Sequence, residues 1–470
     1  MIKRSISCVA GGRVAKDALI SCITEHQARC GRLDMLRRYV KNEHDILKRE
    51  RAANKPNNRL VHAFPRYITT MASGYLVGAP VSYADEKQDQ ALEGIAKQYA
   101  RIEIQAKDME LARDTSAYGR AVELLYADST ARPKCAPLDP REAFVVYDDT
   151  VELQPIFGVH FFRAVKNDGK DGAYHVNVYT DTQVERYVVD EIADLKEAVP
   201  EASEAHYFGG VPINEYFNDE DETGDFEPVI TLIDAYNTLQ SDRINDKEQF
   251  VDAVLLLHGF SMQDDEDGRT PAEQIKQDRI LMLPGEKAGG EYLSNNLNEE
   301  QTEVLKKAIK EDIHKMSMVP DLTDKEFASD ASGVAMRYKL LGFEQLVKNK
   351  ERWFREGLRD RLRMFAHFMA IKGNPALDVD DVQITFTRSL PTNELELSQI
   401  VQALQDIVPD EILLKLLPFV QDPKAAMELL KQQKAEAAKM NAVAFGMPMN
   451  TPTGEPPEDE EGDEDGKPAA

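Results

Sequence analysis

The feature that most constrains the fold is a series of three long helical patterns in the middle of the chain, separated by two segments rich in turn residues. The order predicted is a helix from Pro228 to His258, a turn-rich segment over 259–298, a helix that Asn298 caps and Pro320 stops, a loop over 319–332 and a helix over 333–371. At about 1.5 Å per residue the first helix would be about 45 Å long. The first two of these helices have no complete core of their own, so we expect them to pack against neighbours.

The flanks of this series predict an α+β protein that is mostly α. A length of 470 residues suits two to three domains. Helical patterns cover 17–52, 87–118 and 392–441, a β meander covers 120–190, and a further strand covers 382–386.

The charge of the chain is strongly negative and unevenly distributed. It has 57 Lys and Arg against 83 Asp and Glu, a net charge of −26. Residues 1–60 are basic, whereas residues 447–470 are acidic, rich in Pro and Gly, and predict a disordered tail. A net anion disfavours a protein that coats DNA, because it repels phosphate. No apolar run is long enough for a membrane span, the first residues do not suit a signal peptide, and four cysteines favour a reducing compartment.

The sequence contains no Gly-rich phosphate-binding loop, no GxSxG nucleophile motif and no HExxH motif, which favours a protein that is not an enzyme and needs no cofactor. An acidic run at Asp264–Gly268 lacks the first and last ligands of a calcium loop, so we interpret it as a solvated loop. Cys22, His26 and Cys30 share one helix face and are a minor candidate for zinc, with a packed helix face favoured. Scattered carboxylates that assemble a metal-dependent nuclease site remain an alternative.

The helix over 333–371 carries nine Lys and Arg against four Asp and Glu. A DNA-reading helix would need its cations on one stripe, but here they go around the polar arc. We therefore interpret this arc as a solvated or subunit-contacting face.

At this point the order of elements resembles the portal, or head–tail connector, proteins of tailed bacteriophages, of the siphophage type. The stretches that carry the resemblance are NRLVHAFPRYITTMASGYLVGAPVSY (58–83), GGVPINEYFNDEDETGDFEPVITLIDAYNTLQSDRINDKEQFVDAVLLLHG (209–259) and MVPDLTDKEFASDASGVAMRYKLLGFEQLVKNKERWF (318–354). It extends from about residue 20 to about residue 440.

The resemblance implies a division of the chain into parts. These are an N-terminal basic helical segment (1–58), a wing of helices and β meander (59–225), a first stem helix (226–258), a clip (259–298), a second stem helix (299–318), a tunnel loop (319–332), a long wing helix with a wing strand (333–390), a helical crown (391–446) and the acidic tail (447–470).

The resemblance also implies a function and partners. Proteins of this family form a ring, normally of twelve subunits, at one capsid vertex, through which double-stranded DNA is packaged and ejected. The expected partners are the other subunits, the large terminase subunit, the head–tail adaptor, the major capsid and scaffolding proteins, and double-stranded DNA without sequence preference, with no membrane. The expected location is the virion, after assembly in the host cytoplasm. A helical capsid scaffold or adaptor without a channel is the other alternative.

The candidate site residues follow from the implied channel. In the tunnel loop they are Asp321, Asp324, Lys325, Glu326, Phe327 and Asp330, and on the second stem helix Lys306, Lys307 and Lys310 are candidates for weak contacts with the DNA backbone. The alternative for the stem lysines, that they face outward or pair with a neighbour's Glu, is left open.

Overall fold

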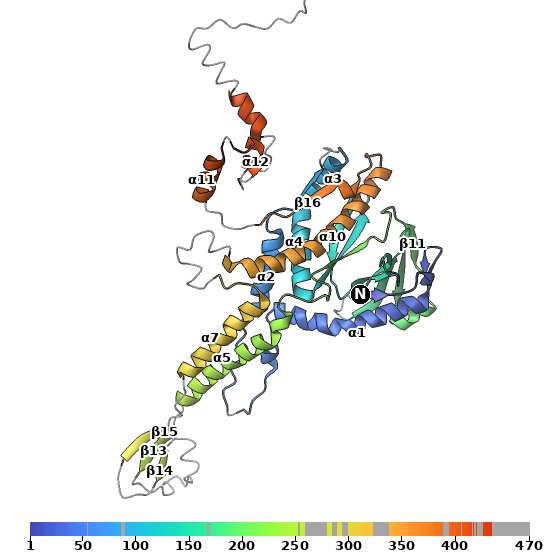
Figure 1. The fold of residues 1–470 in the computed structure, drawn as a ribbon. Coiled ribbons are helices and arrows are strands. Elements are labelled where there is room, and N and C mark those ends of the chain that lie inside the picture. The colour runs from blue at the N-terminus through green and yellow to red at the C-terminus, as the bar shows by residue number, and fades with distance from the viewer. Residues whose placement is uncertain are drawn as a thin grey trace, which may run out of the picture. The chain divides into compact units, whose positions relative to one another are not determined.

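We describe the protein from a computed structural model (Figure 1). The structure describes residues 1–53, 55–85, 90–166, 169, 171–251, 254–258, 280–283, 289–293, 299–322, 338–388, 394–405, 407–415, 417, 420 and 426–434. The chain forms two compact units, Met1–Leu390 and Pro391–Ala470. The predicted acidic tail, 447–470, lies outside the described residues.

The first unit is a mixture of helices and strands. Its α-helices are α1 (Lys16–Val40), α2 (Phe64–Val77), α3 (Gln90–Arg101), α4 (Ile104–Tyr118), α5 (Ile230–Val251), α7 (Glu299–Ser317) and α10 (Leu341–Ile371). Its strands are β1 (Ile2–Lys3), β2 (Val9–Ala10), β3 (Arg13–Val14), β4 (Ser82–Asp85), β5 (Arg120–Ala127), β6 (Pro133–Leu138), β7 (Ala143–Tyr147), β8 (Pro155–Val165), β9 (Asp171–Tyr179), β10 (Gln183–Val189), β11 (Ala202–Ala205), β12 (Ile213–Phe217), β13 (Val254–His258), β14 (Ile280–Leu283), β15 (Gly289–Leu293) and β16 (Val382–Thr385). Helices make up about half of the described residues, consistent with the predicted α+β class.

The strands of the predicted meander belong to two different sheets. β7 to β10 form consecutive antiparallel neighbours in a six-stranded sheet of order β1-β7-β8-β9-β10-β11. β5 pairs instead with β6 on one side and with β12 on the other, in a separate three-stranded sheet. The prediction of one meander over 120–190 was therefore wrong. β12 begins more than twenty residues after the meander ends, and local strand patterns do not specify such distant pairing.

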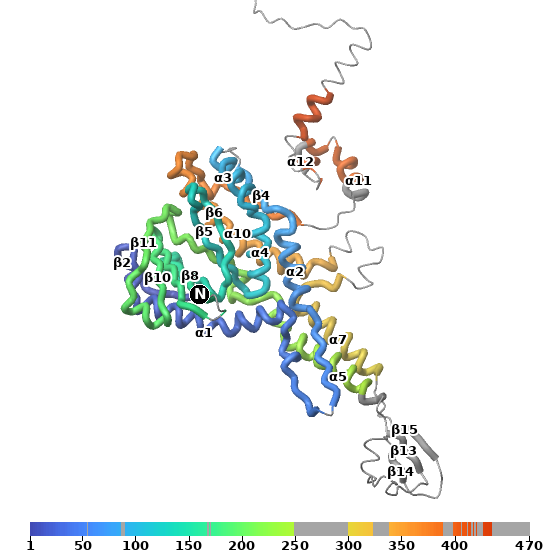
Figure 2. The backbone as a smooth tube through the Cα atoms, turned by 180° about the vertical axis from the view of Figure 1, so that it is seen from behind, coloured from blue at the N-terminus to red at the C-terminus, as the bar shows by residue number. Residues whose placement is uncertain are grey.

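Helix α1 covers one face of the six-stranded sheet (Figure 2). Its buried residues Leu19, Cys22 and Ile23 pack in one cluster with alternate residues of the strands, among them Phe157 and Val159 on β8. The predicted helix over 17–52 thus ends earlier, at Val40. A 3-10 turn at Asp45–Lys48 follows it.

Most of the other helices share a second core. α2, α4, α5, α7 and α10 contribute to one apolar cluster, in which Ile68 of α2 and Leu111 of α4 are fully buried. The helix predicted over 87–118 is divided into α3 and α4, because Glu103 adopts a left-handed conformation with φ 52°. The strand predicted over 382–386 is β16. It pairs with β4, which lies about 300 residues earlier in the chain.

The first long helix ends before its predicted end. α5 stops at Val251, and Val254–His258 forms β13, which pairs in parallel with β14 and antiparallel with β15. The prediction of a helix continuing to His258 was wrong. Short apolar runs satisfy both helical and strand patterns, and here pairing with distant strands decides between them.

In the second unit, the described helices are α11 (Glu394–Leu404), α12 (Asp410–Lys415) and residues 426–434. They fall within the pattern predicted as helical over 392–441. Among the described helices of the chain, none is both long and apolar enough to span a membrane.

Candidate functional site at the paired helices α5 and α7

Helices α5 and α7 run antiparallel, side by side (Figure 1). Arg243 of α5 pairs with Glu303 of α7 at 2.8 Å, and one turn further on Lys247 pairs with Glu299 at 2.9 Å. From the first pair to the second, the residue number rises by four on α5 and falls by four on α7, so the two helices run in opposite directions. Where the pair meets the body of the unit, Ile313 is fully buried in the helical core.

The outer face of α7 leaves apolar side chains in solvent. Val304 is 70% exposed, Leu305 51% and Met316 55%. Leu305 and Met316 share an apolar pattern with Ile309 and Ile313, but within the single subunit Ile313 is fully buried whereas these two residues are exposed. Several exposed large apolar side chains on one long helix are typical of a surface that another chain covers.

The three candidate lysines of α7 each pair with a carboxylate of their own chain. Lys306 lies 2.7 Å from Glu303, Lys307 lies 3.6 Å from Glu311 and Lys310 lies 2.6 Å from Asp321. These pairs are partly or largely exposed, and exposed ion pairs contribute only about 0–1 kcal/mol. These pairs therefore hold the lysines only weakly.

The turn that leaves α7 is held by several side chains. Met318 has a positive φ of 58°, which ends the helix. His314 Nδ1 lies 2.9 Å from the carbonyl oxygen of Val319, and Asp321 bonds to Lys310. Asp321, predicted in the tunnel loop, thus lies in this turn. Of the other predicted loop residues, Asp324, Lys325, Glu326, Phe327 and Asp330 lie outside the described residues.

Two cations of α10 are buried, which contradicts the prediction of a solvated or subunit-contacting arc. Lys350 is 2% exposed and Arg361 is not exposed at all. Lys350 pairs with Asp225, just before α5, at 2.6 Å. Arg361 pairs with Asp108 of α4 at 2.5 Å and with Glu123 of β5 at 2.9 Å. Helical periodicity shows only that a cation lies on one side of a helix, whereas its partner comes from elsewhere in the chain.

A sequence signal for one of these pairs existed. Glu123 interrupts the otherwise apolar strand Ala121–Tyr126, and a charge at the centre of a buried strand indicates a buried partner. The carboxylate also accepts a hydrogen bond from the hydroxyl of Tyr216 at 2.7 Å. Burial raises the pKa of Tyr216, and the opposing charge of Arg361 does not offset it.

Three polar side chains of α5, all fully buried, form a ladder that binds an extended segment before α2. Asn245 Oδ1 accepts the backbone N–H of Asn58 at 2.7 Å, and Ser241 Oγ accepts that of Leu60 at 2.9 Å. Asn237 Oδ1 accepts that of His62 at 2.9 Å. Four helical residues rise about 6 Å and two extended residues about 6.6 Å, so the two repeats match.

The Cys22, His26 and Cys30 face of α1 is packed against the body of the protein. The ring of His26 stacks on Phe144 with centroids 4.6 Å apart. Burial lowers the pKa of His26 to about 3 and raises the pKa of the Cys22 and Cys30 thiols to about 11. Neutral thiols are poor zinc ligands. Among the described residues, no group of three His, Cys, Asp or Glu is arranged to hold a metal ion.

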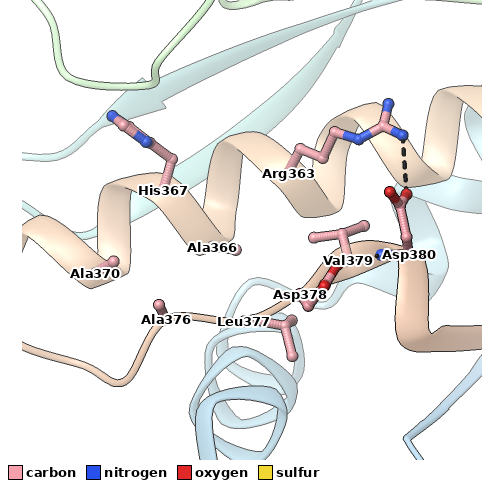
Figure 3. A pocket seen from close by; sticks show the side chains of 9 residues that line it. All are labelled: Arg363, Ala366, His367, Ala370, Ala376, Leu377, Asp378, Val379 and Asp380. Carbon is pink, nitrogen blue, oxygen red and sulfur yellow. Dashed lines mark hydrogen bonds and ion pairs between the residues drawn. The ribbon is translucent and has the colours of Figure 1, made fainter.

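A pocket of about 320 Å³ lies between the C-terminal half of α10 and residues 376–380 (Figure 3). Arg363 pairs with Asp380 across it at 3.3 Å and with Asp360 on its own helix at 2.8 Å. His367 points away from the 376–380 segment. Arg363 and Asp380, two of the charged residues that line this pocket, thus neutralise one another.

A family model described as phage portal protein, SPP1 Gp6-like, matches residues 20–440. The chain belongs to this family. It is 23% identical over 432 residues to the portal protein of Bacillus phage SPP1, covering 86% of this chain and 84% of that protein. It is 21% identical over 425 residues to the portal protein of Clostridium phage phiCD119, covering 86% and 93%.

Membership of this family confirms the predicted resemblance. The family is a structural one rather than an enzyme family, and its phage members are virion components.

Proposed function

We propose that this chain forms a ring at one vertex of a tailed-phage capsid and that double-stranded DNA passes through the ring during packaging and ejection. The observation that carries the proposal is the family match over residues 20–440. In this proposal α5 and α7 are the stem helices, 259–298 is the clip, 319–332 is the tunnel loop, and α10 with the β-sheets forms the wing. The crown is 391–446.

The exposed apolar face of α7 supports assembly into a ring. Val304, Leu305 and Met316 are solvent-exposed in one subunit, and burial is worth about 25 cal/mol per Å² of apolar surface. A closed ring of about twelve subunits would give every copy of this face the same partner surface. The subunits of such a ring are the first partner that we propose.

The charge of the chain supports passage of DNA rather than tight binding. The net charge is −26, and each of the three candidate lysines of α7 already has an acidic partner. Many unpaired cations on the wall would hold phosphates by releasing counterions, whereas an anionic wall lets the duplex slide. Lys306, Lys307 and Lys310, with Lys325 of the loop, would supply weak and repeated contacts.

The proposed partners outside the ring follow from this role. A terminase would supply the energy of packaging, and the segment between α5 and α7 would bind the terminase and later the head–tail adaptor. Capsid and scaffolding proteins would surround the wing, and assembly would take place in the host cytoplasm. No observation on the described residues favours the nuclease or the scaffold alternative.

Negative-stain electron microscopy of the purified protein tests the ring. We expect rings with a central hole and about twelve-fold symmetry. Compact monomers at every protein concentration would contradict the proposal.

The loop is tested separately with Lys325→Ala. Loss of this cation should slow DNA packaging, because it removes one phosphate contact per subunit. An unchanged packaging rate in rings of normal appearance would exclude the loop contact while leaving the ring itself supported.

A further inference from the structure

The helix α2 contacts both helices that flank residues 323–337. At its N-terminal end, Phe64 and Tyr67 lie edge-on to the ring of His314 near the end of α7, each with ring centroids 5.8 Å apart. At its C-terminal end, Tyr75 packs against Phe343 at the start of α10, with centroids 4.8 Å apart. The two ends of α2 therefore contact the end of α7 and the start of α10.

Tyr67 binds the backbone on the α7 side. Its hydroxyl donates to the carbonyl oxygen of Pro320 at 2.8 Å and accepts the N–H of Leu322 at 3.3 Å. One side chain thus satisfies two backbone groups of the turn, and the neighbouring Val319 is fully buried. This side chain fixes the path of the backbone where it leaves α7.

Tyr75 binds the α10 side. Its hydroxyl donates to Glu344 Oε2 at 2.7 Å, and Arg388 lies 3.5 Å from the other oxygen of the same carboxylate. The guanidinium of Arg388 also lies over the Tyr75 ring, 5.5 Å from its centroid. The first turn of α10 is held between α2 and the segment that follows β16.

The two tyrosines are eight residues apart on one helix, about 12 Å along its axis. α2 is itself buried through Ile68, Ala72 and Leu76 in the helical core. A helix packed in this way has little freedom to shift, so the distance between its two attachment points is constant.

We propose that Tyr67 and Tyr75 are positioning residues that hold the two ends of the α7–α10 connection at a fixed spacing on α2. The inference rests on the proposed function in one respect: if the connection is the tunnel loop, α2 determines where the loop starts and ends on the channel wall. The attachment of both ends to α2 does not depend on that assignment.

The test uses Tyr67→Phe, Tyr75→Phe and the double variant in the full-length protein. Each change removes only a hydroxyl. The matched control is Tyr187→Phe, whose hydroxyl donates to Glu185 at 2.8 Å in the six-stranded sheet, a bond of the same kind as that of Tyr75. Amide hydrogen exchange is followed in peptides that cover 317–322 and 338–344.

We expect Tyr67→Phe to accelerate exchange in 317–322, and Tyr75→Phe in 338–344, each about two- to ten-fold and each without effect on the other peptide. Tyr187→Phe should leave both peptides unchanged. If the exchange in both peptides is the same in the variants as in the wild type, the two tyrosines do not hold the ends of the connection on α2.

The second readout is the rate of DNA packaging by rings of each variant with procapsids, a terminase motor and linear duplex DNA. We expect the double variant to assemble rings and melt like the Tyr187→Phe control but to package DNA more slowly. A packaging rate equal to the control would overturn the positioning role. If the wild type forms no ring, the proposed function fails, while the exchange experiment still decides whether α2 holds both ends.

Discussion

The buried cations of α10 determine how this helix is fixed in the protein. Lys350 bonds to Asp225 and to the amide oxygen of Asn218, and Arg361 bonds to carboxylates from α4 and β5. Burial would lower the pKa of the Arg361 guanidinium, but the charges of Asp108 and Glu123 outweigh it and raise that pKa. The arginine therefore stays charged, and each pair connects α10 to a segment more than 100 residues away in the sequence.

Removing one of these cations should be costly. Arg361→Met leaves Asp108 and Glu123 buried without their partner, so we expect a loss of about 3–5 kcal/mol in the free energy of unfolding. Arg352→Met, at an exposed position on the same helix, should change it by less than about 0.5 kcal/mol. Denaturant titration of the two variants measures the difference, and equal stabilities would show that the buried pair contributes nothing.

A second residue makes stability depend on pH. Burial, together with the nearby charges of Glu110 and Asp139, raises the pKa of Asp114 to about 7. Between about pH 4, the ordinary pKa of an aspartate, and about pH 7, the folded protein keeps this proton while the unfolded chain releases it. Asp114 therefore lowers stability increasingly as the pH rises from about 4 to about 7.

Asp114→Asn should abolish this dependence. Relative to the wild type, the variant should gain little at about pH 5 and most at about pH 8, because the amide has no proton to release. Thermal unfolding at several pH values measures the gain. Asp149→Asn, at an exposed position, serves as the control and should show no such trend. A gain that is the same at every pH would contradict the assignment.

At the scale of elements, two glycines of α10 have different roles. α10 is continuous from Leu341 to Ile371. A Cβ on Gly357 would lie 2.4 Å from the ring of Tyr216, and the Gly357 carbonyl accepts a hydrogen bond from Asn214 at 2.7 Å. Gly357 thus lets α10 approach β12 closely, whereas nothing lies within 4 Å of a Cβ on Gly342.

Alanine at these two positions should have opposite effects. Gly357→Ala should destabilise the protein by about 1–3 kcal/mol, because the methyl group collides with a fully buried ring. Gly342→Ala should stabilise it by about 0.5–1 kcal/mol through helix propensity. Equilibrium unfolding of both variants tests this, and a destabilised Gly342→Ala would show that its surroundings are not open.

The ladder on α5 is also a property of elements rather than of single residues. Asn237, Ser241 and Asn245 recur every fourth position, a spacing that the sequence shows but that has no evident partner there. Their partner is an extended segment about 180 residues earlier in the chain. Sequence reasoning missed this contact because extended segments without alternating apolar residues carry no periodic signal.

At the scale of the whole molecule, the exposed face of α7 links the single subunit to the proposed ring. Leu305→Glu places a charge on this face. Because Leu305 is half exposed in the subunit, the variant should fold with nearly unchanged stability but fail to form rings.

The control for this prediction is Val199→Glu. Val199 is 79% exposed and belongs to neither α5 nor α7. Sedimentation velocity at several concentrations separates rings from single subunits. We expect the control to form rings like the wild type, and rings of normal size from Leu305→Glu would show that this face is not between subunits.

The order of helices, the acidity of the tail and the family resemblance are properties that the amino-acid sequence alone determined. Helical periodicity, helix ends at proline and net charge depend on residues close together in the chain, so they need no partner to be recognised. The three quoted stretches were specific enough to indicate the family, and the family match confirms it.

Only the tertiary structure decided which charges are buried, where α5 gives way to β13, and which strands share a sheet. Arg361 and Asp108 are 253 positions apart, and Tyr67 and Pro320 are also 253 apart. Contacts over such separations depend on the packing of whole elements, and local sequence patterns are the same whether or not they form.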